Sequence, residues 1–219
     1  MLLTDTMTVK TDSQTVFVID DDADVRDSLK WLLESVGLKV QAFENALDFF
    51  DQADVNQSGC IVMDVRMPGL SGINAQKKLP EHNIELPVIM ISAHGNVDMA
   101  VTALTQGALT FIEKPFDDQL LIDHVHNALE KDRVRRFRQG SQIRMREHYE
   151  SLTRRERQVL ELIVKGLSNQ EAADQLQINR KTVEGHRANM MAKMQVDSFA
   201  ELVQVAISLG LLPDYNTAG

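Results

Sequence analysis

The chain has 219 residues, of which 43% are hydrophobic and 25% charged, a composition typical of a globular protein. No apolar stretch approaches the roughly 18 residues of a membrane span. At the N-terminus no basic segment precedes an apolar core, so no secretory signal is expected. The single Cys60 excludes an internal disulfide and fits a reducing cytoplasm.

The net charge of −9 is unevenly spread along the chain. Residues 1–130 carry 8 basic and 21 acidic side chains, a balance of −13, whereas residues 131–219 carry 15 and 11, a balance of +4. We therefore expect two domains, and we expect any nucleic acid to bind the second.

The acidic half alternates short apolar runs with helical patterns, after a polar and aperiodic lead-in over residues 1–14. The apolar runs that predict strands cover residues 16–19, 38–43, 60–64, 87–91 and 109–113. Helical spacing or capping residues follow them at 25–36, 45–53, 72–79, 96–106 and 117–131. Five alternating units predict a doubly wound, flavodoxin-like α/β fold with a five-stranded parallel sheet in the order 2-1-3-4-5.

Four of the expected strands end in polar side chains. Asp20 and Asp21 follow the first strand, Asp64 ends the third, and Ser92 and Lys114 end the fourth and fifth. In this strand order, all four carboxyl ends surround one pocket. Each feature is ordinary by itself, but together they predict a phosphoryl site, in which clustered carboxylates recruit a cation such as Mg²⁺.

Two other interpretations of the aspartates fail on spacing. An EF-hand loop that begins at Asp20 needs Gly at its sixth position and Glu at its twelfth, where this chain has Val25 and Trp31. A phosphatase of the haloacid-dehalogenase type would have Thr or Val two residues after its second Asp, where this chain has Asp24.

Over about residues 14–130 the sequence resembles the receiver domain of two-component response regulators. The matching motifs are the acidic pair 20–21, Asp64-x-x-x-Pro68-x-x-x-Gly72, Ser92-Ala93 and Lys114-Pro115-Phe116. The resemblance implies that Asp64 accepts a phosphoryl group. It also implies that Mg²⁺ is bound by Asp21, Asp64 and the backbone carbonyl of Arg66, with Asp20 acting through water.

The same resemblance implies a switch at the far strands of the sheet. Ser92 would be the switch hydroxyl, Lys114 would contact the phosphoryl oxygen, and Phe111 falls where the family has a rotating aromatic ring. The alternative is that Phe111 is a static core residue and that the output is governed by linker contacts alone. The peptide bond between Lys114 and Pro115 would be cis.

Residues 131–147 are expected to form a helical linker that extends the fifth helix. The basic residues of this region favour a solvated helix over contact with DNA phosphates: Lys131, Arg133, Arg135, Arg136, Arg138, Arg144 and Arg146.

The pattern of residues 148–213 predicts four helices. Thr153 and Glu156 form a capping box for the first, and the others are expected at 168–176, 179–194 and 198–209. The second and third helices, joined by a short turn, make a helix-turn-helix at about 168–187.

This segment resembles the LuxR-type DNA-binding domain. The motifs are Leu152-Thr-x-Arg-Glu-Arg157, Gly166-x-Ser-Asn169, Thr182-Val-Glu-x-His-Arg187 and Lys193-Met-x-Val196. A receiver followed by this domain resembles the NarL/FixJ class of response regulators, and Arg66 and Ser92-Ala-His-Gly95 are most similar to its FixJ branch.

The resemblance implies a phosphorylation-activated transcriptional regulator in the cytoplasm, not at a membrane. A sensor histidine kinase would phosphorylate it, and the phosphorylated homodimer would bind promoter DNA and act with RNA polymerase. It would be no enzyme beyond its own phosphorylation and dephosphorylation.

Helical periodicity sorts the residues of the third of these helices. Val183, His186, Met190 and Met194 follow the inward spacing, so His186 is expected to pack in the core. The candidate DNA contacts are outward or near the N-terminal end, which enters the major groove in this motif: Arg180, Lys181, Thr182, Glu184, Arg187 and Ala188. Glu184 would contribute to selectivity, by accepting from cytosine.

Two other classes of function remain for comparison. An enzyme with an aspartyl-phosphate intermediate would leave residues 148–213 unexplained. A receiver that acts only through protein contacts would fail to bind genomic DNA fragments.

Overall fold

The computed structural model describes residues 14–54, 57–93 and 95–212. Most of the predicted lead-in, His94 of the Ser92-Ala-His-Gly95 motif and residue 213 of the predicted second domain lie outside the described residues. The chain divides into two compact units between Arg136 and Phe137, and each unit is described by itself. In the part that the structure describes, no helix is long and apolar enough to cross a membrane.

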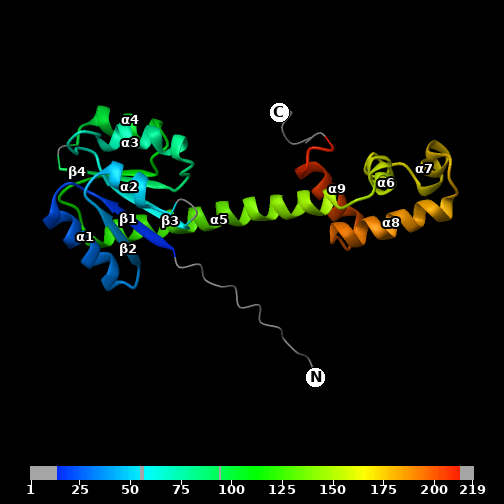
Figure 1. The fold of residues 1–219 in the computed structure, drawn as a ribbon, viewed down its shortest axis with the longest axis horizontal. Helices are drawn as coiled ribbons and strands as arrows, with labels where there is room; N and C mark the ends of the chain where they lie inside the picture. Colours follow the sequence, from blue (N-terminus) through cyan, green and yellow to red (C-terminus); the bar gives the residue numbers. More distant parts are fainter. Residues whose placement is uncertain (1–13, 55–56, 94, 213–219) are drawn as a thin grey trace, which may run out of the picture. The chain divides into compact units, whose positions relative to one another are not determined.

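The first unit contains a five-stranded sheet whose neighbouring strands are all parallel (Figure 1). Its order is β2-β1-β3-β4-β5, which confirms the predicted fold and strand order. The strands are β1 (Thr15–Ile19), β2 (Lys39–Phe43), β3 (Gly59–Asp64), β4 (Val88–Ser92) and β5 (Thr110–Glu113).

Five α-helices follow these strands in turn. They are α1 (Ala23–Ser35), α2 (Ala46–Gln52), α3 (Gly72–Lys78), α4 (Val97–Thr105) and α5 (Asp118–Glu150). Asp22, Asn45 and Asn96 cap α1, α2 and α4 by accepting hydrogen bonds from backbone N–H groups of the first turn. A short 3₁₀ helix, η1 (Leu79–His82), follows α3 and was not predicted.

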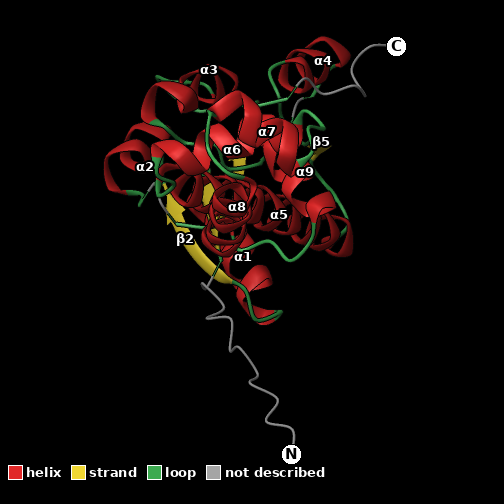
Figure 2. Ribbon diagram, turned by 90° about the vertical axis from the view of Figure 1, so that its right-hand side faces the viewer, coloured by secondary structure: helices red, strands yellow, loops and turns green. Residues whose placement is uncertain are grey.

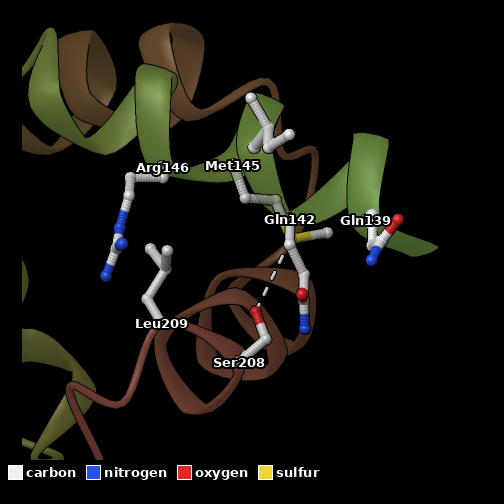
Figure 3. A pocket seen from close by; sticks show the side chains of 7 residues that line it. Gln139, Gln142, Met145, Arg146, Ser208 and Leu209 are labelled. Atoms are coloured by element: carbon white, nitrogen blue, oxygen red, sulfur yellow. Dashed lines mark hydrogen bonds between the residues drawn. The ribbon is translucent and has the colours of Figure 1, made fainter. Parts of the chain in front are cut away.

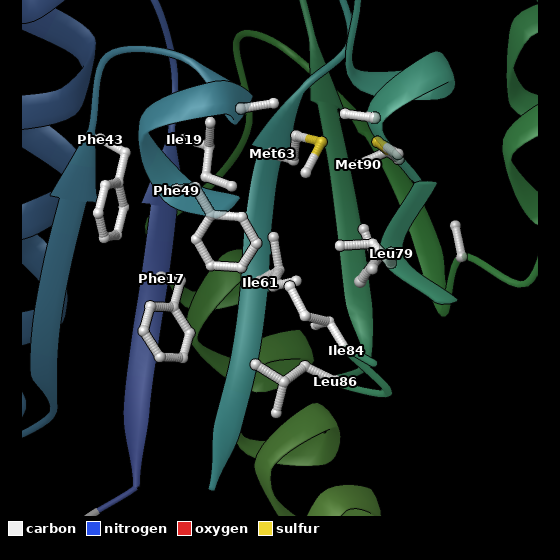
Figure 4. Packing of buried hydrophobic residues seen from close by; sticks show 14 of the residues in the cluster. Phe17, Ile19, Phe43, Phe49, Ile61, Met63, Leu79, Ile84, Leu86 and Met90 are labelled. Atoms are coloured by element: carbon white, nitrogen blue, oxygen red, sulfur yellow. The ribbon is translucent and has the colours of Figure 1, made fainter. Parts of the chain in front are cut away.

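Helices lie on both faces of the sheet (Figure 2). An apolar layer fills the space between the sheet and the helices on each face. On one face, Phe17, Phe43 and Phe49 pack edge to face or tilted, with ring centroids 5.5–6.4 Å apart (Figure 4). This layer also takes in residues of α3 and α4. On the other face, strand residues such as Val18 pack against residues of α1 and α5. Because both faces are covered, the central strands read as continuous apolar runs.

The helix α5 continues far beyond the apolar pattern that predicted it. It runs without a break to Glu150 and so includes residues 131–147. Ahead of it, the bond between Lys114 and Pro115 is cis, as the resemblance implied.

The second unit contains the C-terminal part of α5 and four further helices, α6 (Arg154–Val164), α7 (Asn169–Leu176), α8 (Arg180–Met194) and α9 (Phe199–Ser208) (Figure 1). Thr153 and Ser168 each form a capping box, with Glu156 and Glu171 respectively. Gln177 ends α7 in the left-handed conformation, and Asn179 then caps α8. This tight turn makes the predicted helix-turn-helix.

Candidate functional site

The carboxyl ends of β1, β3 and β5 meet around one ammonium group. Lys114 Nζ, just after β5, lies 2.7 Å from Asp20 Oδ2 and 2.8 Å from Asp64 Oδ1. Asp20 is 1% exposed and Asp64 is 6% exposed, so both carboxylates are withdrawn from bulk water. Lys114 lies 94 positions from Asp20 and 50 positions from Asp64 in the sequence, and the order of the strands brings the three residues together.

The second oxygen of Asp64 is also engaged. Asp64 Oδ2 accepts a hydrogen bond of 2.6 Å from the backbone N–H of Arg66, in the loop that leaves β3. Burial raises the pKa of the Asp64 carboxyl above its ordinary value, although the hydrogen bonds from Lys114 and Arg66 oppose the shift. The ionised carboxylate is thus held in an environment that does not fully stabilise it.

Lys114 stays charged in this position. Burial alone would lower the pKa of its ammonium group, but the hydrogen bonds to Asp20 and Asp64 outweigh it and raise the pKa above its ordinary value. Asp20 is fixed further, because Oδ1 accepts from the N–H of Asp22 at 3.0 Å and its carbonyl accepts from Arg26 Nη1 at 2.7 Å.

A cavity of about 250 Å³ opens at this cluster. It is lined by Asp20, Asp21, Asp22, Val25, Asp64, Arg66, Ala93 and Lys114. Among the described residues no three His, Cys, Asp or Glu side chains gather closely enough to form a metal site by themselves. A cation here would instead use two carboxylates with backbone and water oxygens, which is how Mg²⁺ is commonly bound. One ammonium among buried carboxylates leaves excess negative charge, so the residues fit such an ion.

Ser92 and Phe111, the other predicted switch residues, do not line this cavity. Ser92 is fully buried, and its carbonyl accepts from the N–H of Lys114 at 2.8 Å, so the two residues are linked through the backbone. Phe111 is half-buried beside Met90 and packs against the layer that contains α4. Its ring lies so close to Gly95 that a Cβ there would be 2.8 Å from Phe111 Cε1.

An apolar stripe lies on the outer surface of α4. Val97, Val101 and Leu104 are 78%, 56% and 47% exposed and recur at the i, i+4 and i+7 positions of one helical face. The helix that carries the stripe packs against β5, the strand that contains Phe111. Exposed apolar side chains in such a row are typical of protein interfaces.

In the second unit, the N-terminal end of α8 carries most of the predicted DNA contacts on its surface. Lys181 and Ala188 are exposed, and Arg180 Nε lies 2.9 Å from Glu184 Oε1. The Thr182 hydroxyl donates to Asn179 Oδ1 at 2.9 Å, so it takes part in the N-cap of the helix.

Arg187 has structural partners as well. Its guanidinium donates to Asn169 Oδ1 at 3.2 Å, and its Cζ lies 5.8 Å from the centre of the Phe199 ring. Val183, Met190 and Met194 are buried as the spacing predicts, whereas His186 is only half-buried.

One pair in the second unit was missed from the sequence. Glu156 is 4% exposed; beside its capping role it accepts from Lys193 Nζ at 2.8 Å, which ties α6 to α8. Burial opposes its ionisation, but the hydrogen bonds from Lys193 and Thr153 lower the pKa of Glu156 below its ordinary value. Both residues lie in recognised motifs, but 37 positions separate them and nothing in either motif indicates the contact.

Another hollow, of about 440 Å³, lies in the second unit between α5 and α9 (Figure 3). Ser208 Oγ lies 3.5 Å from Met145 Sδ at its floor. The hollow is lined by Gln139, Gln142, Ile143, Met145, Arg146, Ser208 and Leu209. None of the predicted site residues is among these, so it forms no part of either predicted site.

Comparison with known proteins matches both units to families. Residues 16–126 match the response regulator receiver domain, and residues 150–206 match the bacterial regulatory proteins of the luxR family. The chain is 40% identical to the transcriptional regulatory protein FixJ of Bradyrhizobium diazoefficiens, over 91% of this chain and 97% of that protein. It is 41% identical to the transcriptional regulatory protein TdiR of Thauera aromatica, over 87% of this chain and 84% of that protein.

Among solved structures, the response regulator StyR is 41% identical and superposes with a TM-score of 0.82, over 89% of this chain and 98% of that one. Both family matches lie in this chain in the order receiver then LuxR-type domain, and the similarity to FixJ and StyR extends over nearly the whole of each protein. The chain therefore belongs to the FixJ-type response regulators, the DNA-binding transcriptional regulators of two-component signalling systems.

Proposed function

We propose that Asp64 is the phosphoacceptor of this response regulator and that its phosphorylation promotes dimerisation and promoter binding. The observation that carries the proposal is the buried arrangement of Asp64, Lys114 and Asp20 at the carboxyl ends of three parallel strands. In this regulator the receiver domain would span residues 14–130, the helical linker 131–147 and the DNA-binding domain 148–213.

The chemistry follows from the groups in the pocket. An oxygen of Asp64 attacks the phosphorus atom of a phosphohistidine in the sensor kinase, forming an acyl phosphate as the phosphorus–nitrogen bond breaks. The imidazole leaves with the bonding electrons and takes up a proton. Lys114, already 2.8 Å from Asp64, is positioned to pair with a phosphoryl oxygen.

Three residues would hold a magnesium ion beside Asp64. Asp21 and the backbone carbonyl of Arg66 would bind it together with Asp64, while Asp20 would act through a water molecule. When bound, Mg²⁺ would neutralise charge on the phosphoryl oxygens. Before phosphorylation Asp20 and Lys114 are paired at 2.7 Å, which orders the pocket around the acceptor.

The switch would run from the pocket to the α4 stripe. Ser92 and Lys114 would turn toward the new phosphoryl group, and Phe111 would move into the space near Ser92. Gly95 and the Val97–Val101–Leu104 stripe lie along this route, and a reshaped stripe can pair with its copy about a two-fold axis.

The phosphorylated dimer would present two copies of α8 to promoter DNA in the cytoplasm, where it would act with RNA polymerase. The DNA contacts would come from Arg180, Lys181, Thr182, Glu184, Arg187 and Ala188. Two such helices match half-sites about one turn of DNA apart.

Labelling with a small phosphodonor such as acetyl phosphate tests the acceptor. Asp64→Asn should keep the fold and lose the acid-labile label, because an amide cannot form the acyl phosphate. Asp24→Asn, which removes an exposed carboxylate of the same acidic segment, is the matched control and should be labelled like the parent. Undiminished labelling of Asp64→Asn would move the acceptor to another residue.

A further inference from the structure

A buried carboxylate in α5 lies against the start of β3, at the end of that strand opposite to Asp64. Asp132 is fully buried, although it falls in the segment expected to be a solvated linker. Its Oδ2 accepts hydrogen bonds from Ser58 Oγ at 2.7 Å and from the backbone N–H of Gly59 at 3.0 Å. Carboxylates are seldom fully buried unless they are paired.

Two arginines from the next turn of α5 close over this carboxylate. Arg135 Nη2 lies 2.5 Å from Asp132 Oδ1, and Arg136 Nε lies 2.8 Å from Oδ2. Arg136 also donates to the carbonyl of Gln57 at 2.8 Å, and Arg135 pairs with Glu85 just before β4. We call Asp132, Arg135 and Arg136, with residues 57–59, the α5 clamp.

The Asp132 carboxylate at the centre of the α5 clamp is ionised. Burial would raise the pKa of the Asp132 carboxyl, but the hydrogen bonds from Arg135, Ser58, Gly59 and Arg136 outweigh it and lower the pKa below its ordinary value. Arg135 and Arg136 are 29% and 31% exposed, so only the Asp132 end of each pair is fully buried, and loss of its charge leaves both guanidiniums without their common counter-ion.

The strand that the clamp holds is rigidly packed at this end. A Cβ at Gly59 would lie 1.9 Å from the carbonyl oxygen of Thr15, so β1 and β3 approach each other closely here. Gln57 Nε2 donates to Thr15 Oγ1 at 2.7 Å, and Gln14 Nε2 donates to the carbonyl of Leu129 in α5 at 2.8 Å. The first residues of both strands are therefore joined to α5.

We propose that the α5 clamp fixes residues 132–136 of the linker helix to the receiver. A structural change around β3 on phosphorylation is thereby transmitted to the helix that leads to the DNA-binding unit. One strand connects the two ends: β3 begins at Gly59, which Asp132 holds, and ends at Asp64. The functional part of this proposal rests on the proposed role of Asp64. An open clamp lets α5 fray after Leu129, and the effect of phosphorylation on the second unit is then weakened.

The test compares two variants of the full chain. Asp132→Asn keeps the shape of the side chain and removes its charge. Glu130→Gln is the matched control, because it breaks an ion pair of the same helix, Glu130 to Arg133 at 2.7 Å, in which both side chains are more than half exposed. The DNA probe is the genomic fragment that the parent chain binds most tightly after selection.

Asp132→Asn should accept label from acetyl phosphate as the parent does. Its amide hydrogens at Gly59 and residues 132–140 should exchange faster, and its gain in DNA affinity on phosphorylation should be about two- to thirtyfold smaller. Glu130→Gln should match the parent in all three measurements. If Asp132→Asn keeps the exchange rates and the affinity gain of the parent, the proposal is wrong.

Two further outcomes are informative. If the parent gains no affinity on phosphorylation, the proposed function fails, while the exchange measurement still decides whether the clamp fixes the helix. If Asp132→Asn does not fold, Ser58→Ala removes a single hydrogen bond of the clamp and should give the same changes at smaller size. Parent-like behaviour of a folded Ser58→Ala and of Arg136→Gln would overturn the proposal.

Discussion

Lys114 Nζ lies 2.8 Å from Asp64 Oδ1, so the residue expected to accept a phosphoryl group is paired with a cation before any phosphate arrives. The same ammonium holds Asp20 at 2.7 Å, and both carboxylates are buried. The pocket is therefore organised in advance for an anion at Asp64 and a cation beside it, and part of the folding free energy maintains this arrangement.

Asp64→Asn should raise the free energy of unfolding at neutral pH by about 0.5–2 kcal/mol. Because burial raises the pKa of Asp64, the folded chain binds this proton more tightly than the unfolded chain does. Stability of the parent then falls as pH rises from the ordinary pKa of aspartate through the raised folded value. The benefit of the amide should be full above that interval and absent below it.

Urea unfolding of the parent and Asp64→Asn at several pH values, with divalent cations chelated, measures this difference. Lys114 keeps Asp20 as a partner in the variant, so its own charge is not left uncompensated. Asp27→Asn, on the exposed side of α1, is the matched control, because it makes the same substitution away from the Lys114 cluster. A difference between parent and Asp64→Asn that stays constant over the whole pH range would contradict the prediction.

Magnesium should stabilise the parent and leave Asp21→Asn nearly unaffected. An ion that binds only the folded state adds about 2.7 kcal/mol at a concentration of 100 times its dissociation constant. Thermal unfolding with Mg²⁺ and with a chelator gives the shift in Tm for each protein. The fluorescence of Trp31, the sole tryptophan, gives a second readout, because Trp31 and Lys114 line the same surface groove beside α1. Equal shifts in the parent and in Asp21→Asn would remove Asp21 from the metal site.

The sequence predicted the receiver fold well because its signals are local. Apolar runs, capping residues such as Asn45 and Asn96, and polar residues at strand ends each lie within a few positions of the feature they predict. The strand order then follows from general rules for parallel sheets, which bring Asp20, Asp64 and Lys114 to one edge.

Contacts between distant segments could not be predicted in the same way. Asp132 is one acidic residue in a run of charges, and only the fold reveals that it meets Ser58, which lies 74 positions earlier. Likewise, Arg187 has the outward spacing of a DNA contact, but its contact with Asn169 depends on the packing of α7 against α8. Helical periodicity assigns a face to a residue and says nothing about which neighbour meets that face.

Lys181→Ala should reduce the salt dependence of DNA binding. Each phosphate contact releases condensed counterions and contributes about −0.9 to the slope of log affinity against log salt. Lys181 is exposed at the first turn of α8, so loss of one phosphate contact should flatten the slope by about that amount. If Lys181 contacts guanine instead, the substitution should relax specificity at one operator position, at a cost of about 1–3 kcal/mol.

Fluorescence anisotropy of a labelled promoter fragment at several salt concentrations measures the slope. Lys165→Ala, at the exposed end of α6, is the matched control. An unchanged slope together with unchanged base preference would exclude Lys181 from the DNA interface.

Glu184→Gln frees Arg180 from its intrahelical partner at 2.9 Å, and it should strengthen binding to non-specific DNA.

Ser92→Ala should accept a phosphoryl group and dimerise poorly. Phosphorylation adds nearly two negative charges and three strong acceptors at Asp64. The Ser92 hydroxyl, on a fully buried residue at the end of β4, is the donor expected to answer them. To move an equilibrium from mostly inactive to mostly active takes about 5.5 kcal/mol of differential binding. One exposed hydrogen bond contributes far less than that. If the Ser92 hydroxyl also repositions β4 and frees space for Phe111, the whole α4 surface changes, and many contacts then contribute to the equilibrium.

Sedimentation of the phosphorylated or beryllofluoride-treated proteins decides between this route and its alternatives. Ser28→Ala, on the exposed side of α1, should dimerise like the parent. Val101→Asp, which introduces a charge into the apolar stripe of α4, should be phosphorylated normally and remain monomeric, because like charges would then face each other across a two-fold axis. If Ser92→Ala dimerises as readily as the parent while Val101→Asp does not, the α4 surface is the interface but Ser92 does not control it. If both variants dimerise, phosphorylation acts through another surface, and Phe111 is a static part of the core.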